Sequence, residues 1–503
     1  MFTLNPDSSL LPVDLERFAR ESKHQVAFGV EARSVVARSH QVFCKLRDRA
    51  EPLYGSTTGF GPFVTFDSGA DGASSGEHAI GLLEHLGAGF GAPAPTEVVR
   101  AAMFIRLLTI CRGYSGISPG VVEAYLSLLN SGAVPVVPSI GSLGASGDLI
   151  PLAHIARPLV GRGHVAFNGA ILSGETFLAQ SQSVAVQLEP RDALALVNGT
   201  SFSTAYAALA LTRAWRLLIS AERLCALLFV TLRCNPQALD PVLHQVRGHS
   251  GQSESAAAIR AEIARLGGYT LDSSRPLQEI YSVRCAPQVL GACRAQLTHA
   301  EFLINAEING VDDNPLILPG DATCPEGRAV HGGNFFAQQI AFAADAINAA
   351  LTQVAVLVDR QIDLLANPHQ NGGAPLLLAR EPGRQSGLAG AQLTATALVS
   401  EMRGRCQQHA TGSIPSNCGN QDIVPMAATA ARAAYDQTEH LSGVLAVLAL
   451  ALLQLNHLRR EGVAPGEAAA HLPSLPEFVP LDADRALHGT IGQFSNFFLH
   501  PAA

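Results

Sequence analysis

Lysine is nearly absent from this 503-residue chain, which contains only Lys23 and Lys45. Enzymes that use pyridoxal phosphate hold it through a Schiff base to a lysine. Both lysines lie in a polar N-terminal region, away from any glycine-rich or apolar segment that would surround such a cofactor. The composition therefore argues against pyridoxal chemistry.

Charged residues and metal-binding motifs are also scarce. Only 15% of the residues are charged, the formal net charge is −8 and basic residues do not cluster, so nucleic acid is not an expected partner. The nine cysteines form no CxxC pair, HExxH is absent and His331 has no second ligand at a useful spacing, so no metal is expected. The low charge predicts that contacts between subunits cover much of the surface.

No segment of the chain predicts export or membrane insertion. The N-terminal residues lack the basic head and apolar core of a signal peptide. The longest apolar run, residues 444–453, is too short to span a bilayer and is typical of a buried helix. Scattered cysteines fit a reducing compartment, so we expect a cytoplasmic protein without membrane contact.

Two kinds of pattern divide the chain at about residue 200. Glycine and proline interrupt the first part often, whereas apolar residues recur at three- and four-residue spacing in the second, which predicts helices. Strand-like alternation is limited to short pieces such as residues 164–172. We expect a mainly α protein in which a glycine-rich N-terminal domain (1–200) precedes a bundle of long helices (201–503). The long helices are predicted at 201–232, 295–309, 334–363, 388–404 and 426–460.

The segment IGSLGASGDLIPLAHIA, residues 140–156, places three glycines, two serines and an aspartate directly before an apolar run. Its glycines permit conformations closed to other residues and bring backbone atoms close together. Taken alone, it is equally well explained as a helix N-terminus, with Ser146 or Asp148 as N-cap and Pro151 in the first turn. Other polar fragments, most of them containing glycine, also have structural explanations when taken singly. They are YGSTTGFG (54–61), ALVNGTS (195–201), QEIYSVRCAPQ (278–288), HGGNF (331–335) and SNCGNQD (416–422).

Together and in this order, the fragments resemble the ammonia-lyases and aminomutases that act on histidine, phenylalanine or tyrosine. The resemblance covers nearly the whole chain, and Ala145-Ser146-Gly147 followed by Asp-Leu-x-Pro-Leu-Ala is its most specific part. In that family these three residues cyclise to 4-methylideneimidazol-5-one, an electrophile that requires no external cofactor. Closure needs the Gly147 nitrogen to attack the Ala145 carbonyl carbon, which small side chains permit, and Ser146 then loses water. Asp148 is a candidate acid or base for that step.

The resemblance implies roles for residues in the other fragments. Arg284 offers donors that match the carboxylate of an amino acid substrate. Tyr54 resembles the catalytic base that removes the β proton, and its pKa of about 10 would require a neighbouring positive field. Tyr281 is a second candidate for proton transfer, and the sequence leaves open which tyrosine is the base. Asn198 is expected to hold the ring carbonyl and the substrate carboxylate.

The resemblance also implies a homotetramer in which each site combines residues from three subunits. Gly61 is expected to leave a backbone group accessible to the substrate. The implied substrate-binding residues are Gly61, His85, Leu86, Asn198, Arg284, Asn314, Phe335, Asn417, Asn420 and Gln421.

Two positions discriminate among substrates within the family. His85-Leu86 is similar to the pair of tyrosine lyases, whereas phenylalanine lyases typically carry Phe-Leu and histidine lyases Ser-His. Histidine lyases carry glutamate where Gln421 stands, and plant phenylalanine lyases and several aminomutases carry glutamate where Asn417 stands. The sequence therefore predicts a tyrosine ammonia-lyase that gives 4-coumarate and ammonia.

Alternatives remain within the family. A tyrosine 2,3-aminomutase could use the same site, as could a histidine or phenylalanine lyase. An inactive helical scaffold would require a broken Ala-Ser-Gly motif or the loss of the tyrosines, and all of these residues are present. Asp312 replaces the usual Thr or Ser before Asp-Asn-Pro, and Glu279 replaces an aspartate. The loop at 64–76 is longer and richer in glycine than in typical tyrosine lyases, which leaves the choice between lyase and aminomutase open.

Overall fold

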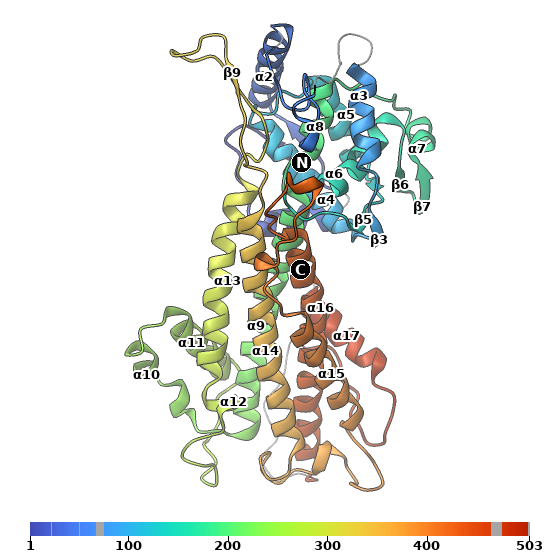
Figure 1. Cartoon of the computed structure of the whole chain (residues 1–503). Coiled ribbons are helices and arrows are strands. Elements are labelled where there is room, and N and C mark those ends of the chain that lie inside the picture. The colour runs from blue at the N-terminus through green and yellow to red at the C-terminus, as the bar shows by residue number, and fades with distance from the viewer. Residues whose placement is uncertain (22, 50, 67–74, 464–474, 501–503) are drawn as a thin grey trace. The chain divides into compact units, whose positions relative to one another are not determined.

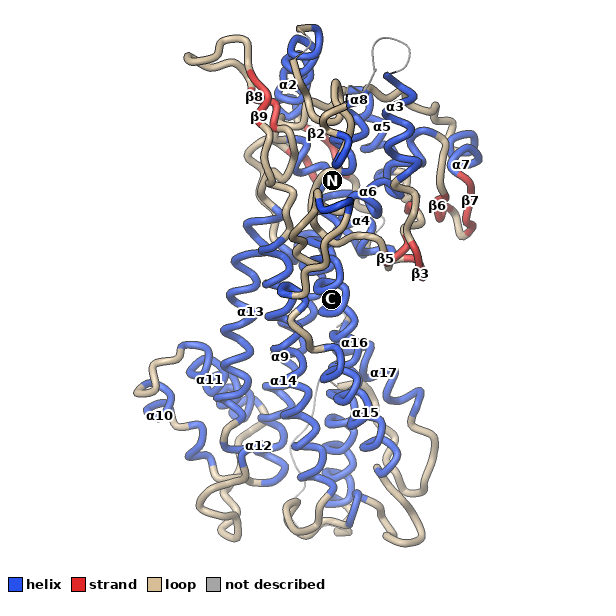
Figure 2. The backbone as a smooth tube through the Cα atoms, viewed as in Figure 1, coloured by secondary structure: helices blue, strands red, loops and turns tan. Residues whose placement is uncertain are grey.

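The protein was analysed as a computed structural model that describes residues 1–21, 23–49, 51–66, 75–463 and 475–500. The described chain is mainly helical and its strands are short (Figure 2), as the sequence predicts. It forms two compact units. The first comprises Met1–Leu209, Glu301–Asp345 and Gln408–Arg432, and the second comprises Ala210–Ala300, Ala346–Gln407 and Ala433–Ala503.

The first unit contains short helices joined by turns and small strand pairs (Figure 1). Frequent glycine and proline keep these helices short, because both residues interrupt regular hydrogen bonding. Its helices are α1 (Pro12–Arg20), α2 (Val30–Asp48), α3 (Ser75–His85), α4 (Thr96–Cys111), α5 (Pro119–Asn130), α6 (Leu149–Ala156), α7 (Gly174–Gln180) and α8 (Pro190–Val197), with 3-10 turns η1 (Gly61–Phe63), η3 (Arg157–Val160), η6 (His409–Thr411) and η7 (Asn417–Gly419).

All strands described in the chain belong to the first unit. A parallel pair joins β1 (Phe2–Leu4) to β2 (Val26–Phe28), and antiparallel pairs join β3 (Phe90–Pro93) to β5 (Pro138–Ile140) and β8 (Leu316–Leu318) to β9 (Arg328–Val330). An antiparallel three-stranded sheet contains β4 (Val134–Pro135), β6 (His164–Phe167) and β7 (Ala170–Ser173), in the order β4-β6-β7. The last two strands confirm the alternation predicted at 164–172.

Long helices make up most of the second unit, and four of them also have residues in the first. These four are α9 (Ser201–Leu232), α13 (Ala286–Ile308), α14 (Gln338–Ala366) and α16 (Ala427–Arg460). The second unit also contains η4 (Pro236–Leu239), α10 (Pro241–Gln245), α11 (Ser250–Arg265), α12 (Tyr281–Arg284), η5 (Leu376–Leu378), α15 (Ala389–Arg405) and α17 (His488–Leu499). By length and composition α14 and α16 could each cross a membrane, but most residues in the most apolar window of each helix are buried, as in the core helices of other proteins.

The observed units differ from the contiguous division expected at residue 200. The first unit also takes in residues 301–345 and 408–432, because the long helices carry the chain from the second unit back to the first. Within the extended loop predicted at 64–76, residues 67–74 lie outside the described residues.

Three helices of the first unit frame the site. α8 packs against both α3 and α6, and the three helices lie together in Figure 1. The antiparallel pairing of β3 with β5, in which Phe90 lies opposite Ile140, fixes the chain just before the glycine-rich loop. The loop 141–148 therefore runs between an anchored strand and α6.

Candidate active site

A cavity of about 1320 Å³ lies entirely within the first unit. Its volume exceeds the ~300–1,000 Å³ of typical ligand pockets, so it has room for more than one amino acid. Among the described residues of its wall, Asp422 is the only aspartate, glutamate, lysine or arginine. The wall includes these predicted site residues: Tyr54, Gly61, His85, Leu86, Ala145, Ser146, Gly147, Asn198, Asn314, Phe335, Asn417, Asn420 and Gln421.

The Ala145-Ser146-Gly147 loop is pressed against the start of α9. Gly147 has φ +68°, and a Cβ atom added there would lie 2.2 Å from the carbonyl oxygen of Gly199. A side chain at residue 147 is therefore excluded twice, by the left-handed backbone and by this close approach. The Gly147 N–H and the Ala145 carbonyl are hydrogen-bonded to no other described residue, so both groups that ring closure requires are uncommitted.

Asn198 holds the middle of this loop. It follows α8 directly, and its side-chain Nδ2 donates to the Ser146 carbonyl oxygen at 2.9 Å. The Asn198 Oδ1 is buried and has no hydrogen-bond partner among the described residues. Because a buried polar atom without a partner is costly, this oxygen is a candidate contact for a bound ligand.

Asp148 anchors the other end of the loop. Its carboxylate accepts hydrogen bonds from the Ser142 hydroxyl at 2.6 Å and from the Ser203 N–H and hydroxyl at 2.7 and 2.9 Å. Asp148 directly precedes α6, but its side chain does not cap that helix and lies instead at the N-terminus of α9. Burial raises the pKa of Asp148, and these hydrogen bonds oppose the rise. The arrangement makes Asp148 a positioning residue.

Gln421 contacts the loop from the turn at residues 416–421. Its Nε2 donates to the Ser146 hydroxyl at 2.8 Å, while its Oε1 accepts from the Ser416 hydroxyl at 2.7 Å. The second bond orients the amide so that its donor group faces Ser146. A glutamate here would have only acceptors and could not donate to the Ser146 oxygen.

Tyr54 and Gly61 face each other across the glycine-rich turn that contains them. The Gly61 N–H donates to the Tyr54 hydroxyl at 2.8 Å, so this N–H is already engaged. Glycine is required here because φ is +53°. Burial raises the pKa of Tyr54, and the Gly61 hydrogen bond lowers it only in part. His331 Nε2 accepts the Tyr54 backbone N–H at 3.2 Å, so this histidine nitrogen is already used.

His85 and Leu86 lie at the end of α3. His85 is exposed to the cavity, and its Nδ1 lies 3.2 Å from the Gly81 carbonyl oxygen. A carbonyl can only accept, so Nδ1 carries a proton, and in the neutral ring Nε2 is left as an acceptor. Leu86 is buried beside it and adds an apolar contact to the wall.

Sequence reasoning missed Phe60 and His78 in the same wall. Their rings stack with centroids 4.9 Å apart. Burial lowers the pKa of His78, and its Nε2 has no hydrogen-bond partner among the described residues. The spacing of His78 and His85, two helical turns apart, places them on one face of α3 and could have identified His78.

Tyr281 and Arg284 do not line this cavity and belong to the second unit. Both lie on the short helix α12, with the Arg284 guanidinium 4.6 Å from the Tyr281 ring centroid. Tyr281 is 69% exposed. The Arg284 Nε is buried and has no hydrogen-bond partner among the described residues. The cavity of the first unit therefore contains neither of these two predicted site residues among its described lining residues.

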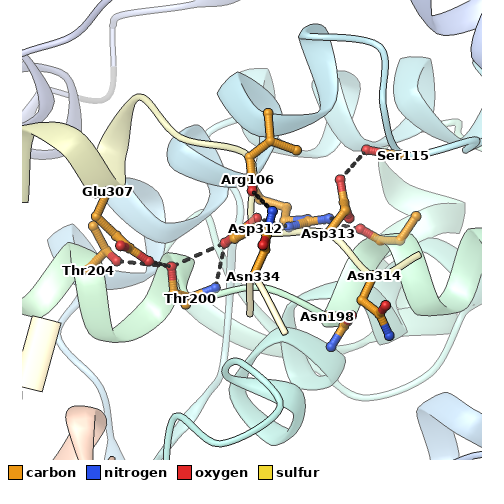
Figure 3. A network of polar contacts seen from close by, with 12 residues as sticks. Arg106, Ser115, Asn198, Thr200, Thr204, Glu307, Asp312, Asp313, Asn314 and Asn334 are labelled. Atoms are coloured by element: carbon orange, nitrogen blue, oxygen red, sulfur yellow. Dashed lines mark hydrogen bonds and ion pairs between the residues drawn. The ribbon is translucent and has the colours of Figure 1, made fainter. Parts of the chain in front are cut away.

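A buried polar network lies beside Asn198 and Asn314, two residues of the cavity wall (Figure 3). Arg106 lies between the carboxylates of Asp312 and Asp313 and bonds to both, with Nη1 2.9 Å from Asp312 Oδ1. Asp312 Oδ2 accepts the Thr200 N–H at 2.6 Å. Asp312, which departs from the family pattern, thus fixes the start of α9 and with it the Gly199 carbonyl beside Gly147.

The same network holds the Asn314 side of the cavity wall. Arg191 donates from its Nη1 to the Asn314 carbonyl oxygen at 3.1 Å, and the Gly332 N–H donates to Asn314 Oδ1 at 2.8 Å. The Ser115 hydroxyl donates to Asp313 at 2.6 Å. These bonds join segments up to about two hundred residues apart, so their pairing was not visible in the sequence.

Comparison with known proteins identifies the family. The sequence model described as aromatic amino acid lyase matches residues 10–474. A histidine ammonia-lyase of Symbiobacterium thermophilum is 37% identical over 92% of this chain and 90% of its own length, and a tyrosine ammonia-lyase of Cereibacter sphaeroides is 36% identical over 99% of both. The crystal structure of tyrosine aminomutase from Streptomyces globisporus aligns with a TM-score of 0.88 at 31% identity, covering 99% of this chain and 96% of that one. The chain belongs to the family of aromatic amino acid ammonia-lyases and aminomutases and is an enzyme of the carbon–nitrogen lyase type.

Proposed function

We propose that the enzyme is a tyrosine ammonia-lyase, which converts L-tyrosine to trans-4-coumarate and ammonia. The observation that carries the proposal is the hydrogen bond between His85 Nδ1 and the Gly81 carbonyl oxygen in the cavity wall. With Nδ1 protonated toward Gly81, the Nε2 atom accepts a hydrogen bond from the substrate phenol. Leu86 offers an apolar surface for the ring of the substrate.

Residues 145–147 fit the 4-methylideneimidazol-5-one group that the resemblance implies. The Gly147 nitrogen bonds to the Ala145 carbonyl carbon as the first water leaves, and Ser146 loses its hydroxyl and α proton as the second. Gly147 leaves the space that this approach needs, and Asn198 would hold the group through the Ser146 carbonyl oxygen. When formed, the group supplies an electrophilic carbon that makes departure of the substrate amine feasible.

Tyr54 is our candidate for the base that removes the β proton. Its hydroxyl lies in the cavity wall and already accepts one hydrogen bond, from Gly61. Burial raises the pKa of Tyr54, which opposes its action as a base at neutral pH. A nearby cation would lower that pKa, but none of the described residues that line the cavity is an arginine or lysine.

A second copy of the chain supplies that cation in our proposal. Arg284 has a buried Nε without a partner among the described residues, and its guanidinium matches the carboxylate of an amino acid. The cavity is larger than one amino acid requires, which leaves space for a segment of another subunit. We therefore infer a homotetramer in which Tyr281 and Arg284 of one subunit complete the cavity of another.

Gln421 favours an aromatic substrate over histidine. Its amide is held between Ser416 and Ser146 and carries no net charge. A glutamate, which histidine lyases have at this position, would pair with the imidazole of the substrate. The cavity offers Asp422 as a carboxylate, but its neighbour Gln421 is the residue that contacts Ser146.

The second candidate is a tyrosine 2,3-aminomutase, favoured by the structural similarity to the enzyme from Streptomyces globisporus. It would use the same residues to remove ammonia and then return it to the β carbon. The two functions differ in whether 4-coumarate leaves the cavity before ammonia is added back. Analysis of the products therefore separates them.

The proposal is tested by replacing His85 with phenylalanine. The variant loses the phenol's hydrogen-bond partner, which is worth roughly 1–3 kcal/mol or about a ten- to hundredfold change in selectivity. We expect kcat/KM to fall for tyrosine and rise for phenylalanine, so that the preference reverses. An unchanged preference would show that His85 does not read the phenol.

A further inference from the structure

Three potential metal ligands meet outside the cavity. His40 and Cys44 are one helical turn apart on α2, and Glu189 directly precedes α8. Their ligand atoms, Nε2, Sγ and Oε1, all lie within 4.8 Å of one another. None of the three lines the cavity, and the proposed reaction uses none of them. Motif spacing did not reveal the cluster, because the third residue is 145 positions beyond Cys44 in the chain.

The ring of His40 is oriented for binding through Nε2. Its Nδ1 lies 3.2 Å from the carbonyl oxygen of Gly116, which can only accept, so Nδ1 carries a proton. Metal-binding histidines are commonly fixed in this way by a carbonyl or carboxylate behind the ring. In the neutral ring, Nε2 then directs a lone pair toward Cys44 and Glu189.

The Glu189 carboxylate is also oriented from behind. Arg47 Nη1 donates to Oε2 at 2.6 Å, which turns Oε1 toward His40. Oε1 and the Nε2 of a neutral His40 are both acceptors, 3.9 Å apart. Two acceptors that face each other repel unless a proton or a cation lies between them.

The distances suit a tetrahedral ion of the zinc class. Cys44 Sγ lies 3.6 Å from His40 Nε2, and bonds of about 2.3 Å to sulfur and about 2.1 Å to nitrogen separate such ligands by about 3.6 Å. The same geometry separates nitrogen and oxygen ligands by about 3.4 Å, compared with 3.9 Å here. A small rotation of the partly exposed Glu189 side chain closes that difference.

We propose that His40, Cys44 and Glu189 bind one zinc-class divalent cation, with water as the fourth ligand. On binding, the thiol of Cys44 releases its proton to solvent, and the thiolate and carboxylate charges balance the two charges of the ion. The ion would link α2 to the N-terminus of α8, the helix that Asn198 directly follows. The site lies outside the cavity and is independent of the proposed substrate.

Cobalt substitution in the full-length protein tests this proposal. Protein stripped with EDTA is titrated with Co²⁺, and a thiolate ligand gives a strong near-ultraviolet charge-transfer band that Zn²⁺ then removes. We expect one ion per chain and release of about one proton, since burial raises the pKa of the Cys44 thiol and keeps it protonated in the free protein. Absence of the band would overturn the proposal.

Matched variants assign the ligands. Cys44→Ala and His40→Ala should abolish the band and weaken Zn²⁺ binding by at least about 100-fold, and Cys44→Ser serves if the alanine variant does not fold. Cys324→Ala is the control, since Cys324 is another partly buried thiol of the first unit. Binding that persists in the Cys44 variants, or that is lost in Cys324→Ala, would contradict the assignment. A protonated His40 paired with Glu189 would give no cobalt band.

Discussion

The hydroxyl of Thr200 lies 2.6 Å from the carboxylate oxygen Oε1 of Glu307 (Figure 3). The same hydroxyl lies 3.1 Å from Asp312 Oδ2, and its single proton can be donated to only one of the two carboxylates. Asp312 is paired with Arg106, whereas Glu307 is partly buried and forms no ion pair in the part of the chain that the structure describes. Burial accordingly raises the pKa of Glu307 to about 7.

Replacing Glu307 with glutamine is predicted to change how stability depends on pH. The folded state holds the Glu307 proton more tightly than the unfolded state, so stability falls as the pH rises from about 4.5 to about 7. The glutamine variant does not lose this part of the free energy of unfolding. The raised pKa of Glu307 corresponds to a loss of about 3 kcal/mol in the wild type. Its apparent Tm, measured from pH 5 to pH 8.5, should therefore rise relative to wild type as the pH increases.

The control for this prediction is Glu175→Gln, because Glu175 is exposed in the first turn of α7. Its Tm difference from wild type should stay nearly constant with pH. A constant difference for Glu307→Gln as well would mean that Glu307 is ionised throughout and that the buried proton is absent.

The mass of the intact chain tests the self-processing of residues 145–147. We expect active wild-type protein to be lighter than its sequence mass by two water molecules, because ring closure and Ser146 dehydration each release one. Ser146→Ala cannot undergo the dehydration and should have almost no activity. Denaturing mass spectrometry measures the masses of the wild-type and Ser146→Ala chains, and a deamination assay measures their activities. An unmodified mass in active enzyme would exclude the proposed group.

Subunit mixing tests whether the site is shared. Tyr54→Phe and Arg284→Ala chains should each be inactive, because the first lacks the proposed base and the second lacks the guanidinium proposed to bind the substrate carboxylate. If Tyr54 and Arg284 of one site come from different subunits, co-expressed chains carrying separate tags should regain on the order of a quarter of the wild-type sites. Doubly tagged oligomers without activity would place both residues in one subunit's site.

Long periodic segments were predicted well from the sequence. α9 covers the expected residues 201–232, and α16 begins one residue after the predicted start, because apolar spacing over many turns leaves few alternatives. α14 begins at Gln338 rather than residue 334, since the chain at 334–337 forms the turn that contributes Phe335 to the cavity. A local turn outweighed the helical pattern there.

The assembly of the site was only partly accessible from the sequence. The motif residues that line the cavity were predicted through the resemblance to a known family, because each fragment taken singly also has a structural explanation. The Arg106–Asp312 pair joins positions 206 residues apart, and no local pattern encodes such a partner. His78 was missed although it lies two helical turns before His85 on the same face of α3, a spacing that could have identified it.

Product analysis with purified enzyme tests the central claim most directly. L-Tyrosine, L-phenylalanine and L-histidine are supplied separately, and the organic product and ammonia are quantified by chromatography. The account predicts 4-coumarate with an equal amount of ammonia from tyrosine as the preferred reaction, and little turnover of histidine. Accumulation of β-tyrosine without ammonia, or preferred release of ammonia from histidine, would contradict it.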